Sequence, residues 1–426
     1  MLRAKSQKRR RMGVTPAGTG APRRPTCPDL APMPDIRISA TGEFYQRIVS
    51  GASLSRLFRR DSCYNALSMI IVIGGGIIGV SIAYHLSQAK LGEITLIEKE
   101  ALLGSGVTKL CSGGVRSQFE TEINVKFSIE SLKTLNALAG EIGFKKLGYL
   151  ILDTANDSRP RITMQNRLGV ASQYLTPEEI GKRFTFLNLK GVQSGSFYSE
   201  DGLADPASLL AFWEKKARQN GVKFLMETKV TEITKKQDKI TGIKTAKGEM
   251  KADWVILAAG VQSRELGKTI GLDIPIVHRR KYVLVVQGFP FDFPLVMETP
   301  RGWYIKKEGE DALLGMSGKE EKVDFEKQNE STEETIEASL ARVPALETHG
   351  IKKVLSSLSD ETPDKHAIID HSLPGLIIAT GFSGHGFMHS PVTGQIVTAL
   401  VAGEKPVLDP SELKLQRSHI KETIAI

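Results

Sequence analysis

The chain has 426 residues, 41% of them hydrophobic and 25% charged, and three are cysteines. Such a chain is long enough for two or three domains, and its few cysteines exclude a disulfide framework and a metal site built on cysteine pairs. The formal charge of +9 comes from residues 1–68, which hold 13 Lys and Arg against 4 Asp and Glu; the other 44 of each sign cancel, so we expect no nucleic-acid partner.

The basic segment 1–68 is rich in Arg, Pro, Gly and Ala and has no periodic apolar residues before about Phe44, so we expect it to lie outside the fold. Three interpretations stay open: a mitochondrial-type presequence, a disordered interaction tail, or upstream sequence with Met69 as the working start. We favour the third, because Met69 falls immediately before the first predicted strand. Pro and Gly between Gly13 and Pro25 also oppose a regular presequence helix. The expected location is cytoplasmic, or mitochondrial if residues 1–68 are a presequence. The chain has no run of eighteen apolar residues, so we expect no membrane span.

Residues 69–99 predict a strand, a helix and a second strand. The β-branched run 69–73 leads into Gly74-x-Gly76-x-x-Gly79, and the second strand ends at Glu98. The first glycine allows a tight turn, the second lets the backbone approach a pyrophosphate, and the third lets the helix pack close to the strand. Glu98 can accept hydrogen bonds from both ribose hydroxyls and repels a 2′-phosphate, which favours FAD or NAD over NADP. The predicted cofactor-binding residues here are Gly74, Gly76, Ile77, Ile78, Gly79, Glu98 and Lys99.

The loop 101–117 is dense in Gly and Ser, which suits backbone donors lying along a dinucleotide. Ser105 in this loop is a further cofactor-binding candidate. Helical spacing over residues 122–141 and a strand at 148–152 come next.

A helix is predicted to begin at Asp205-Pro206, with Asp as N-cap and Pro in the first turn, and Gly221 closes it. The sequence then predicts a β-meander that returns to the first sheet, with strands at 222–226, 229–235, 239–245 and 253–260. We expect the backbone of Val230 to face an adenine edge and Gly260 to permit close approach of the cofactor.

From residue 278 to 318, alternating strands with aromatic residues predict a second, mainly antiparallel domain that supplies a substrate surface. A helix at 332–342 follows. The chain then returns to the nucleotide fold with a strand at 376–379, a glycine-rich turn at 381–387 and Pro391 near a helix start. The N-terminus of that helix can stabilise negative charge on a flavin ring. The cofactor candidates in this turn are Gly381, Gly384, His385, Gly386 and Phe387.

Several motifs in this order carry a family resemblance: GGGIIG, Glu98, SGGVR, DGLADP, VILAAG, TPDKHAIID and GFSGHGFMHSP. From Met69 to about Arg417 the chain resembles the D-amino-acid oxidase-like flavoprotein superfamily. Within it, the chain is similar to the sarcosine oxidase and glycine oxidase branch, which includes sarcosine oxidase β subunits and dye-linked L-proline dehydrogenases. The resemblance implies FAD and oxidation of a small amino acid, or an N-alkyl or cyclic amino acid of the sarcosine, glycine or proline type, by hydride transfer to flavin N5.

The resemblance also implies the fold, which combines α/β and antiparallel β structure. A Rossmann-like FAD-binding domain is expected to be interleaved with a mainly antiparallel substrate domain. The FAD-binding domain is expected to comprise residues 69–150, 200–277 and 355–417, and the substrate domain residues 151–199 and 278–354.

Three departures from the family pattern refine these expectations. Ser357 stands where monomeric sarcosine oxidases carry the cysteine that links the flavin, so the FAD is expected to be non-covalent. Phe119 and Met388 stand where those enzymes hold the substrate carboxylate with a basic pair, which argues against sarcosine itself. The strand 312–318 lacks the oxygen-activating lysine of that branch, which favours a dye, a quinone or a partner protein as electron acceptor.

Arg116, Tyr304 and His385 are the expected catalytic residues. Arg116 would keep positive potential near flavin and substrate, Tyr304 can hydrogen-bond a carboxylate, and His385 lies among glycines beside the flavin. A surface Arg, a packing Tyr and a structural His are the alternatives. Two other function classes stay open: a 2-hydroxy acid dehydrogenase, for example of 2-hydroxyglutarate, and a non-catalytic flavoprotein subunit for assembly or electron transfer. The expected partners are a small amine or amino acid and an electron acceptor or second subunit, and no metal site is expected.

Overall fold

The computed structural model describes residues 68–317, 332–371, 373–417 and 422. The expectations for the basic extension therefore concern residues that lie outside the described part of the chain, except for Ser68. No helix in the described ranges is long and apolar enough to cross a membrane.

A six-stranded sheet built around β1 (Met69–Ile73) carries the first predicted motif. Its strand order is β18-β19-β12-β1-β2-β8, and all neighbours run parallel except β18 and β19. The strands beside β1 are apolar over most of their length because both faces of the sheet are buried. The remaining strands are β2 (Glu93–Ile97), β8 (Lys223–Leu225), β12 (Trp254–Leu257), β18 (Ile368–Asp370) and β19 (Leu376–Thr380).

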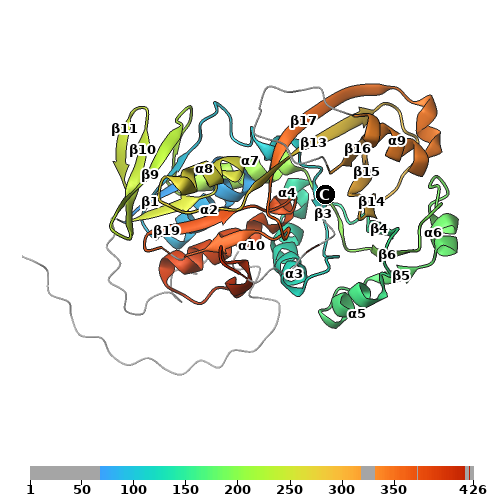
Figure 1. Cartoon of the computed structure of the whole chain (residues 1–426), viewed down its shortest axis with the longest axis horizontal. Helices are drawn as coiled ribbons and strands as arrows, with labels where there is room; N and C mark the ends of the chain where they lie inside the picture. The colour runs from blue at the N-terminus through green and yellow to red at the C-terminus, as the bar shows by residue number, and fades with distance from the viewer. Residues whose placement is uncertain (1–67, 318–331, 372, 418–421, 423–426) are drawn as a thin grey trace, which may run out of the picture. The chain divides into compact units, whose positions relative to one another are not determined.

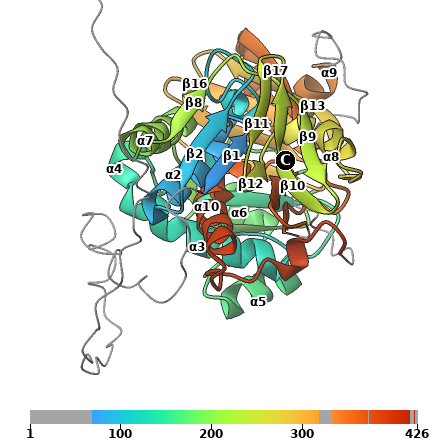
Figure 2. The ribbon, with the colours of Figure 1, turned by 90° about the vertical axis from the view of Figure 1, so that its left-hand side faces the viewer.

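Helices cover one face of this sheet and a small antiparallel sheet covers the other, as Figure 2 shows. Successive strand side chains point to opposite faces, so Ile70 and Val72 pack among the helices while Ile71 and Ile73 pack toward the small sheet. The helical layer contains α2 (Ile77–Ala89), α3 (Glu122–Ala137), α4 (Ala139–Ile142), α7 (Pro206–Gln219) and α10 (Gly386–Ala402). The opposite layer contains β9 (Val230–Lys236), β10 (Lys239–Thr245), β11 (Gly248–Lys251) and α8 (Ser263–Lys268).

The small antiparallel sheet differs from the predicted meander in two strands. The segment predicted as the first meander strand forms β8, which pairs in parallel with β2 and belongs to the six-stranded sheet. The third strand of the meander is β11, which the sequence analysis missed. Its sequence, Gly-Glu-Met-Lys, has no apolar alternation to indicate a strand.

The second large sheet is mixed and has eight strands, in the order β17-β13-β16-β15-β14-β4-β6-β5 (Figure 1). One face carries Trp303 and packs against α9, while the other carries a smaller apolar cluster with Tyr149 and Tyr304. Its strands are β4 (Tyr149–Asp153), β5 (Gln173–Leu175), β6 (Ser194–Tyr198), β13 (Val277–Val286), β14 (Leu295–Thr299), β15 (Trp303–Glu308), β16 (Asp311–Met316) and β17 (Ile351–Glu361). The accompanying helices are α5 (Arg159–Arg167), α6 (Pro177–Arg183) and α9 (Glu333–Arg342).

The two large sheets alternate along the chain, in the interleaved order that the sequence suggested. All of β4 and all of β17 belong to the eight-stranded sheet, so sheet membership changes near residues 149 and 361. The division into a cofactor domain and a substrate domain stays a prediction. The short elements are β3 (Gly114–Val115), β7 (Gly202–Leu203), η1 (Val107–Leu110), η2 (Gly260–Gln262), η3 (Pro344–Thr348) and η4 (Ser411–Leu413).

Candidate functional site

Residues from both large sheets line one cavity of about 490 Å³. It is bordered by the turn between β1 and α2, by η1, by parts of β13 and β15, and by the start of α10. The predicted site residues that line it are Gly74, Gly76, Ile77, Ile78, Glu98, Lys99, Ser105, Arg116, Val230, Gly260, Tyr304, Gly384, His385, Gly386 and Phe387. Among the predicted residues, Gly79 and Gly381 do not line the cavity. The fold thus brings segments more than 300 positions apart around one space.

The glycines of the β1–α2 turn have different surroundings. Gly74 has φ +111°, and a Cβ there would lie 2.3 Å from the carbonyl oxygen of Ala258. A Cβ on Gly79 would lie 2.0 Å from the carbonyl oxygen of Gly74, so Gly79 lets the helix rest on the end of the strand. A Cβ on Gly76 would meet only Thr108 Oγ1, at 3.5 Å, because this position faces the cavity. Two of the glycines therefore serve the turn, and the third keeps the cavity wall open.

Backbone amides and one carboxylate stand at this end of the cavity. Glu98 follows β2 directly, and its carboxylate accepts hydrogen bonds from the N–H groups of Gly75 at 2.6 Å and Glu100 at 2.9 Å. The Ile77 N–H, in the first turn of α2, donates to Thr108 Oγ1 at 3.1 Å. The N-terminus of a helix favours negative charge, so a pyrophosphate fits here, with Glu98 beside it for a ribose.

The second predicted turn, before α10, is fixed by Asp360 at the end of β17. The Gly381 N–H donates to Asp360 Oδ2 at 2.8 Å, and the Ser383 N–H donates to the Asp360 carbonyl at 3.1 Å. Gly381 has φ +70°, and a Cβ there would lie 2.6 Å from Thr362 Cγ2. Gly381 therefore serves the backbone turn, while Phe382 and residues 384–387 line the cavity.

His385 begins α10 and is 3% exposed. Its ring stands edge-on to Phe119, with centroids 4.8 Å apart, and Nε2 has no hydrogen-bond partner among the described residues. Burial, followed by the charge of Arg116, lowers the pKa of His385 well below its ordinary value. The imidazole is therefore neutral at physiological pH and presents a buried polar atom at the cavity.

Arg116 follows β3 and is 1% exposed. Its Nη1 donates to the carbonyl of Gln118 at 2.7 Å, and its guanidinium lies 3.9 Å from the ring centre of Phe119. Burial lowers the pKa of Arg116, but a guanidinium stays protonated in proteins. The Asp201 carboxylate fixes the residues that follow Arg116. It accepts hydrogen bonds from the Ser117 N–H at 2.8 Å and from Gln118 Nε2 at 3.1 Å. The arrangement presents one fixed, buried cation to the cavity.

Three buried tyrosines line the cavity from the eight-stranded sheet: Tyr304 on β15, as expected, and Tyr149 on β4 and Tyr282 on β13, which the sequence did not indicate. Tyr149 and Tyr304 lie in one apolar cluster. Burial raises the pKa of both phenols, so both hydroxyls stay protonated and can donate hydrogen bonds. The Tyr304 ring lies across Gly315 on β16, where a Cβ would come within 2.3 Å of Cε1. Gly315 therefore leaves the space that the Tyr304 ring occupies, because a side chain at residue 315 would collide with the ring.

Lys281 is a second residue that the sequence analysis missed. Strand β16 carries no lysine, as noted, but Lys281 on the neighbouring β13 lines the cavity and pairs in register with Ser357 on β17. Its Nζ lies 3.1 Å from an oxygen of Glu361, a buried carboxylate that Arg279 also approaches at 3.1 Å. The alternating pattern of β13 is visible in the sequence. Which of its side chains face the cavity follows only from the register with β17.

The two positions where a basic pair was missing are apolar and packed. Phe119 is fully buried behind Arg116, and Met388 lines the cavity at 5% exposure. Two observations show that the residues present fit FAD. The cavity-facing Gly76 leaves room at a helix N-terminus, and His385 Nε2 is a buried polar atom without a hydrogen-bond partner among the described residues. Gly74 through Glu98 would hold the dinucleotide, and the turn before α10 would hold the flavin.

Comparisons with known proteins bear on the cofactor and the fold. A family model described as FAD dependent oxidoreductase matches residues 69–400. Mitochondrial dimethylglycine dehydrogenase of Rattus norvegicus is 26% identical over 382 residues, which cover 82% of this chain and 44% of that protein. FAD-dependent oxidoreductase domain-containing protein 1 of Xenopus laevis is 28% identical over 417 residues, covering 83% of each chain. The crystal structure of L-proline dehydrogenase from P. horikoshii superposes with a TM-score of 0.74 and 30% identity, over 82% of this chain and 97% of that one. The chain thus spans less than half the length of the dimethylglycine dehydrogenase.

Proposed function

The chain belongs to the family of FAD dependent oxidoreductases, and on that premise we propose that it oxidises a small amino acid whose amine carbon also bears the carboxylate. The observation that carries the proposal is a cavity in which the glycine turn at Gly76 is continuous with Arg116 and with the buried tyrosines Tyr149 and Tyr304. When bound, FAD supplies the acceptor for the electrons and hydrogen that leave the amine carbon.

The chain's own groups would bind and orient the substrate. Arg116 is a buried cation that can pair with a carboxylate, and the hydroxyls of Tyr149 and Tyr304 can donate hydrogen bonds to it. Because these groups come from different elements of the fold, they would fix both the position and the direction of the substrate. His385 is neutral, so we assign its Nε2 a hydrogen-bonding role toward the amine or the flavin.

The apolar side chains narrow the substrate class. Met388 puts hydrocarbon in place of a charged group at the cavity wall, and Met316 adds a further apolar wall; Phe119 is apolar as well but lies behind Arg116. Such walls favour a substrate with an alkyl or ring substituent near the amine, because burial of that surface contributes about 25 cal/mol per Å². We therefore propose a cyclic amino acid of the proline type, or an N-alkyl amino acid with more apolar surface than sarcosine, ahead of glycine and sarcosine. The flavin would be held without a covalent bond, since Ser357 offers no thiol.

The electron acceptor and the location in the cell are part of the same proposal. The sequence argument for an acceptor other than dioxygen rested on strand β16, and Lys281 now places a cation at the cavity from another strand. We keep a dye, quinone or protein acceptor as the proposal: turnover with an artificial dye should exceed turnover with dioxygen by a wide margin, and Lys281 would account for the dioxygen rate that remains. We propose a cytoplasmic protein; the mitochondrial alternative rests on the Arg-rich residues 1–68, and following a fluorescently fused full-length chain in cells distinguishes the two.

Turnover with an artificial dye tests the function. A panel of L-proline, sarcosine, glycine, dimethylglycine and 2-hydroxyglutarate should yield turnover with at least one amine, and we expect L-proline and dimethylglycine to be better substrates than sarcosine and glycine. In Arg116→Met, kcat/KM for that amine should fall about 100-fold, because a charge-assisted hydrogen bond contributes about 1.5–3 kcal/mol. Arg159→Met removes an exposed guanidinium on α5 and is the matched control. Turnover of the hydroxy acid alone would replace this function with the 2-hydroxy acid alternative.

A further inference from the structure

The substrate-side wall of the cavity depends on a short loop, residues 116–121, between β3 and α3. Arg116 reaches the cavity from this loop, and Phe119 supports both the Arg116 guanidinium and the His385 ring. The loop has no regular structure of its own, so its position must come from contacts with other parts of the chain. At the end of the loop, where α3 begins, the contact comes from a residue far along the chain.

The helix α3 lacks a cap from its own sequence. Thr121 is its N-cap residue, but the Thr121 side chain makes no capping hydrogen bond to the helix. The first N–H groups of a helix have no partner within it and need one from elsewhere. A carboxylate is well suited to this place, because the helix N-terminus carries partial positive charge.

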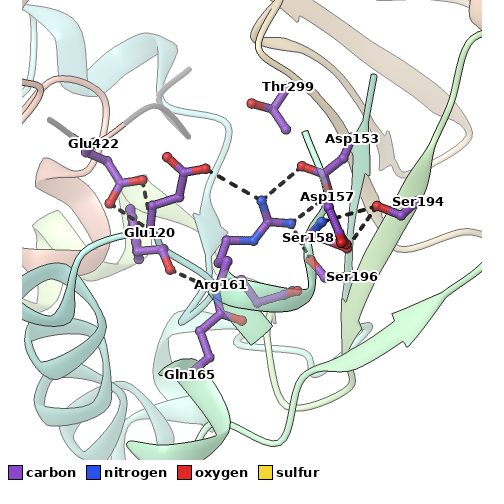
Figure 3. A network of polar contacts seen from close by, with 12 residues as sticks. Glu120, Asp153, Asp157, Ser158, Arg161, Gln165, Ser194, Ser196, Thr299 and Glu422 are labelled. Atoms are coloured by element: carbon purple, nitrogen blue, oxygen red, sulfur yellow. Dashed lines mark hydrogen bonds and ion pairs between the residues drawn. The ribbon is translucent and has the colours of Figure 1, made fainter. Parts of the chain in front are cut away.

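Glu422, about 300 residues further along the chain, supplies that carboxylate. It is fully buried, and its two oxygens lie 3.1 Å from the backbone nitrogen of Glu120. Oε2 is also 3.2 Å from the Thr121 nitrogen, 3.0 Å from Thr121 Oγ1 and 3.2 Å from Asn124 Nδ2. Backbone and side-chain groups at the start of α3 therefore converge on one carboxylate (Figure 3).

Glu422 is held in place from its other side by the segment 362–370. Its own N–H donates to the Asp364 carbonyl at 3.0 Å. The Asp364 carboxylate in turn accepts two hydrogen bonds from Arg417, at 2.6 and 2.8 Å. Glu422 thus links Asp364, through its N–H group, to the loop that carries Arg116, through its carboxylate.

The same loop is tied to the substrate side of the molecule. Gln165 on α5 donates to the Phe119 carbonyl at 2.8 Å. The side chain of Glu120 lies 3.8 Å from Arg161, which makes a two-point ion pair with Asp153 at 3.0 and 2.8 Å (Figure 3). Loss of the Glu422 contacts would free the backbone N–H groups of Glu120 and Thr121, while these contacts would still hold the Phe119 carbonyl and the Glu120 side chain.

We propose that Glu422 is a positioning residue, whose carboxylate fixes the start of α3 and so holds Arg116 and Phe119 at the substrate. The proposal deepens the proposed function and rests on it for its kinetic readout. Glu422 does not contact the cavity, so it acts through the loop. Its removal should weaken substrate binding more than it slows the chemical step, and should leave the cofactor in place.

The experiment uses the full chain with bound FAD and compares Glu422→Gln with Glu412→Gln, which removes the same charge from an exposed position in η4. In Glu422→Gln we expect KM for the amine to rise about fivefold, as for the loss of a helix cap, with kcat within about twofold and an unchanged FAD content. Glu422→Asp keeps the charge and should recover part of the affinity. Thr121→Val removes only one hydroxyl of the site, so it is the milder second variant, and it should shift KM in the same direction.

Hydrogen–deuterium exchange gives a readout that does not depend on turnover. Faster exchange in Glu422→Gln confined to residues 117–125, with Glu412→Gln unchanged, would support the proposal even if no amine were turned over, in which case only the proposed function would fail. Faster exchange throughout the chain, or an unchanged KM together with unchanged exchange at 117–125, would overturn it. Equal effects of Glu422→Gln and Glu412→Gln would overturn it as well.

Discussion

Two alanine substitutions in the β1–α2 turn should separate cofactor binding from folding. At Gly76 the backbone is extended, with φ −74° and ψ 174°, and a Cβ would meet only Thr108 Oγ1 at 3.5 Å. Gly76→Ala should therefore fold, with a stability within about 1 kcal/mol of the wild type, the usual range for a Gly or Ala at a helix N-cap. At Gly79 a Cβ would lie 2.0 Å from the Gly74 carbonyl oxygen, far inside van der Waals contact.

The two substitutions should change different quantities, FAD affinity for Gly76→Ala and folding stability for Gly79→Ala. In Gly76→Ala the new methyl group stands between the pyrophosphate and the amides of α2, and loss of one or two charge-assisted hydrogen bonds costs about 3 kcal/mol, or about a hundredfold in FAD affinity. In Gly79→Ala the helix must move off the strand, and overpacking of this severity costs about 3 kcal/mol or more of folding stability. The first variant should lose flavin and keep its fold, and the second should lose stability.

The assay is the flavin-to-protein ratio of each purified variant, together with thermal unfolding with and without excess FAD. For Gly76→Ala we expect a colourless protein that unfolds cooperatively, near the wild-type transition measured without FAD. A yellow Gly76→Ala protein with wild-type affinity would show that the pyrophosphate does not lie at this turn.

Three further outcomes are expected. Acid precipitation should release all flavin from the wild type, because Ser357 cannot form the thioether; flavin that stays with the polypeptide would contradict this. Burial acts to raise the pKa of Asp364, but Arg417 outweighs it and holds the pKa at about 2, so the stabilisation is complete above the ordinary carboxyl pKa of about 4 and is lost as the pH falls toward 2. Arg417→Met should thus cost about 2 kcal/mol at pH 6 and flatten the acid limb of a stability–pH profile, and an unchanged profile would refute it. Lys281→Met should lower the rate with dioxygen at least about tenfold and leave the dye rate within about twofold, since a nearby cation stabilises the charge formed on oxygen; equal losses in both rates would count against this.

The elements that the sequence predicted well are those with a local cause. The strand and helix around Gly74 follow from apolar periodicity and glycine spacing, and the helix that begins at Pro206 follows from its cap, where Asp205 accepts from the Ala207 and Ser208 N–H groups as expected. Both patterns act within a few residues, so they can be read without knowledge of the rest of the chain.

The missed residues depend on distant parts of the fold. Whether Tyr149 and Lys281 face the cavity depends on strand register, because a shift of one residue moves a side chain to the opposite face. The sheet membership of β8 was missed because a three-residue strand carries no sign of whether its partner is parallel. Glu422 caps a helix that lies about 300 residues away in sequence, and no local pattern marks that contact.

An anaerobic absorption spectrum of the flavin tests the central claim most directly. The full chain with bound FAD is mixed, without oxygen or dye, with L-proline, an N-alkyl amino acid, glycine or 2-hydroxyglutarate in turn. We predict that an amine bleaches the flavin and that Arg116→Met slows the bleaching by about 100-fold at low substrate concentration. Bleaching by 2-hydroxyglutarate alone, or by no member of the panel, would contradict the assignment of this cavity to amine oxidation.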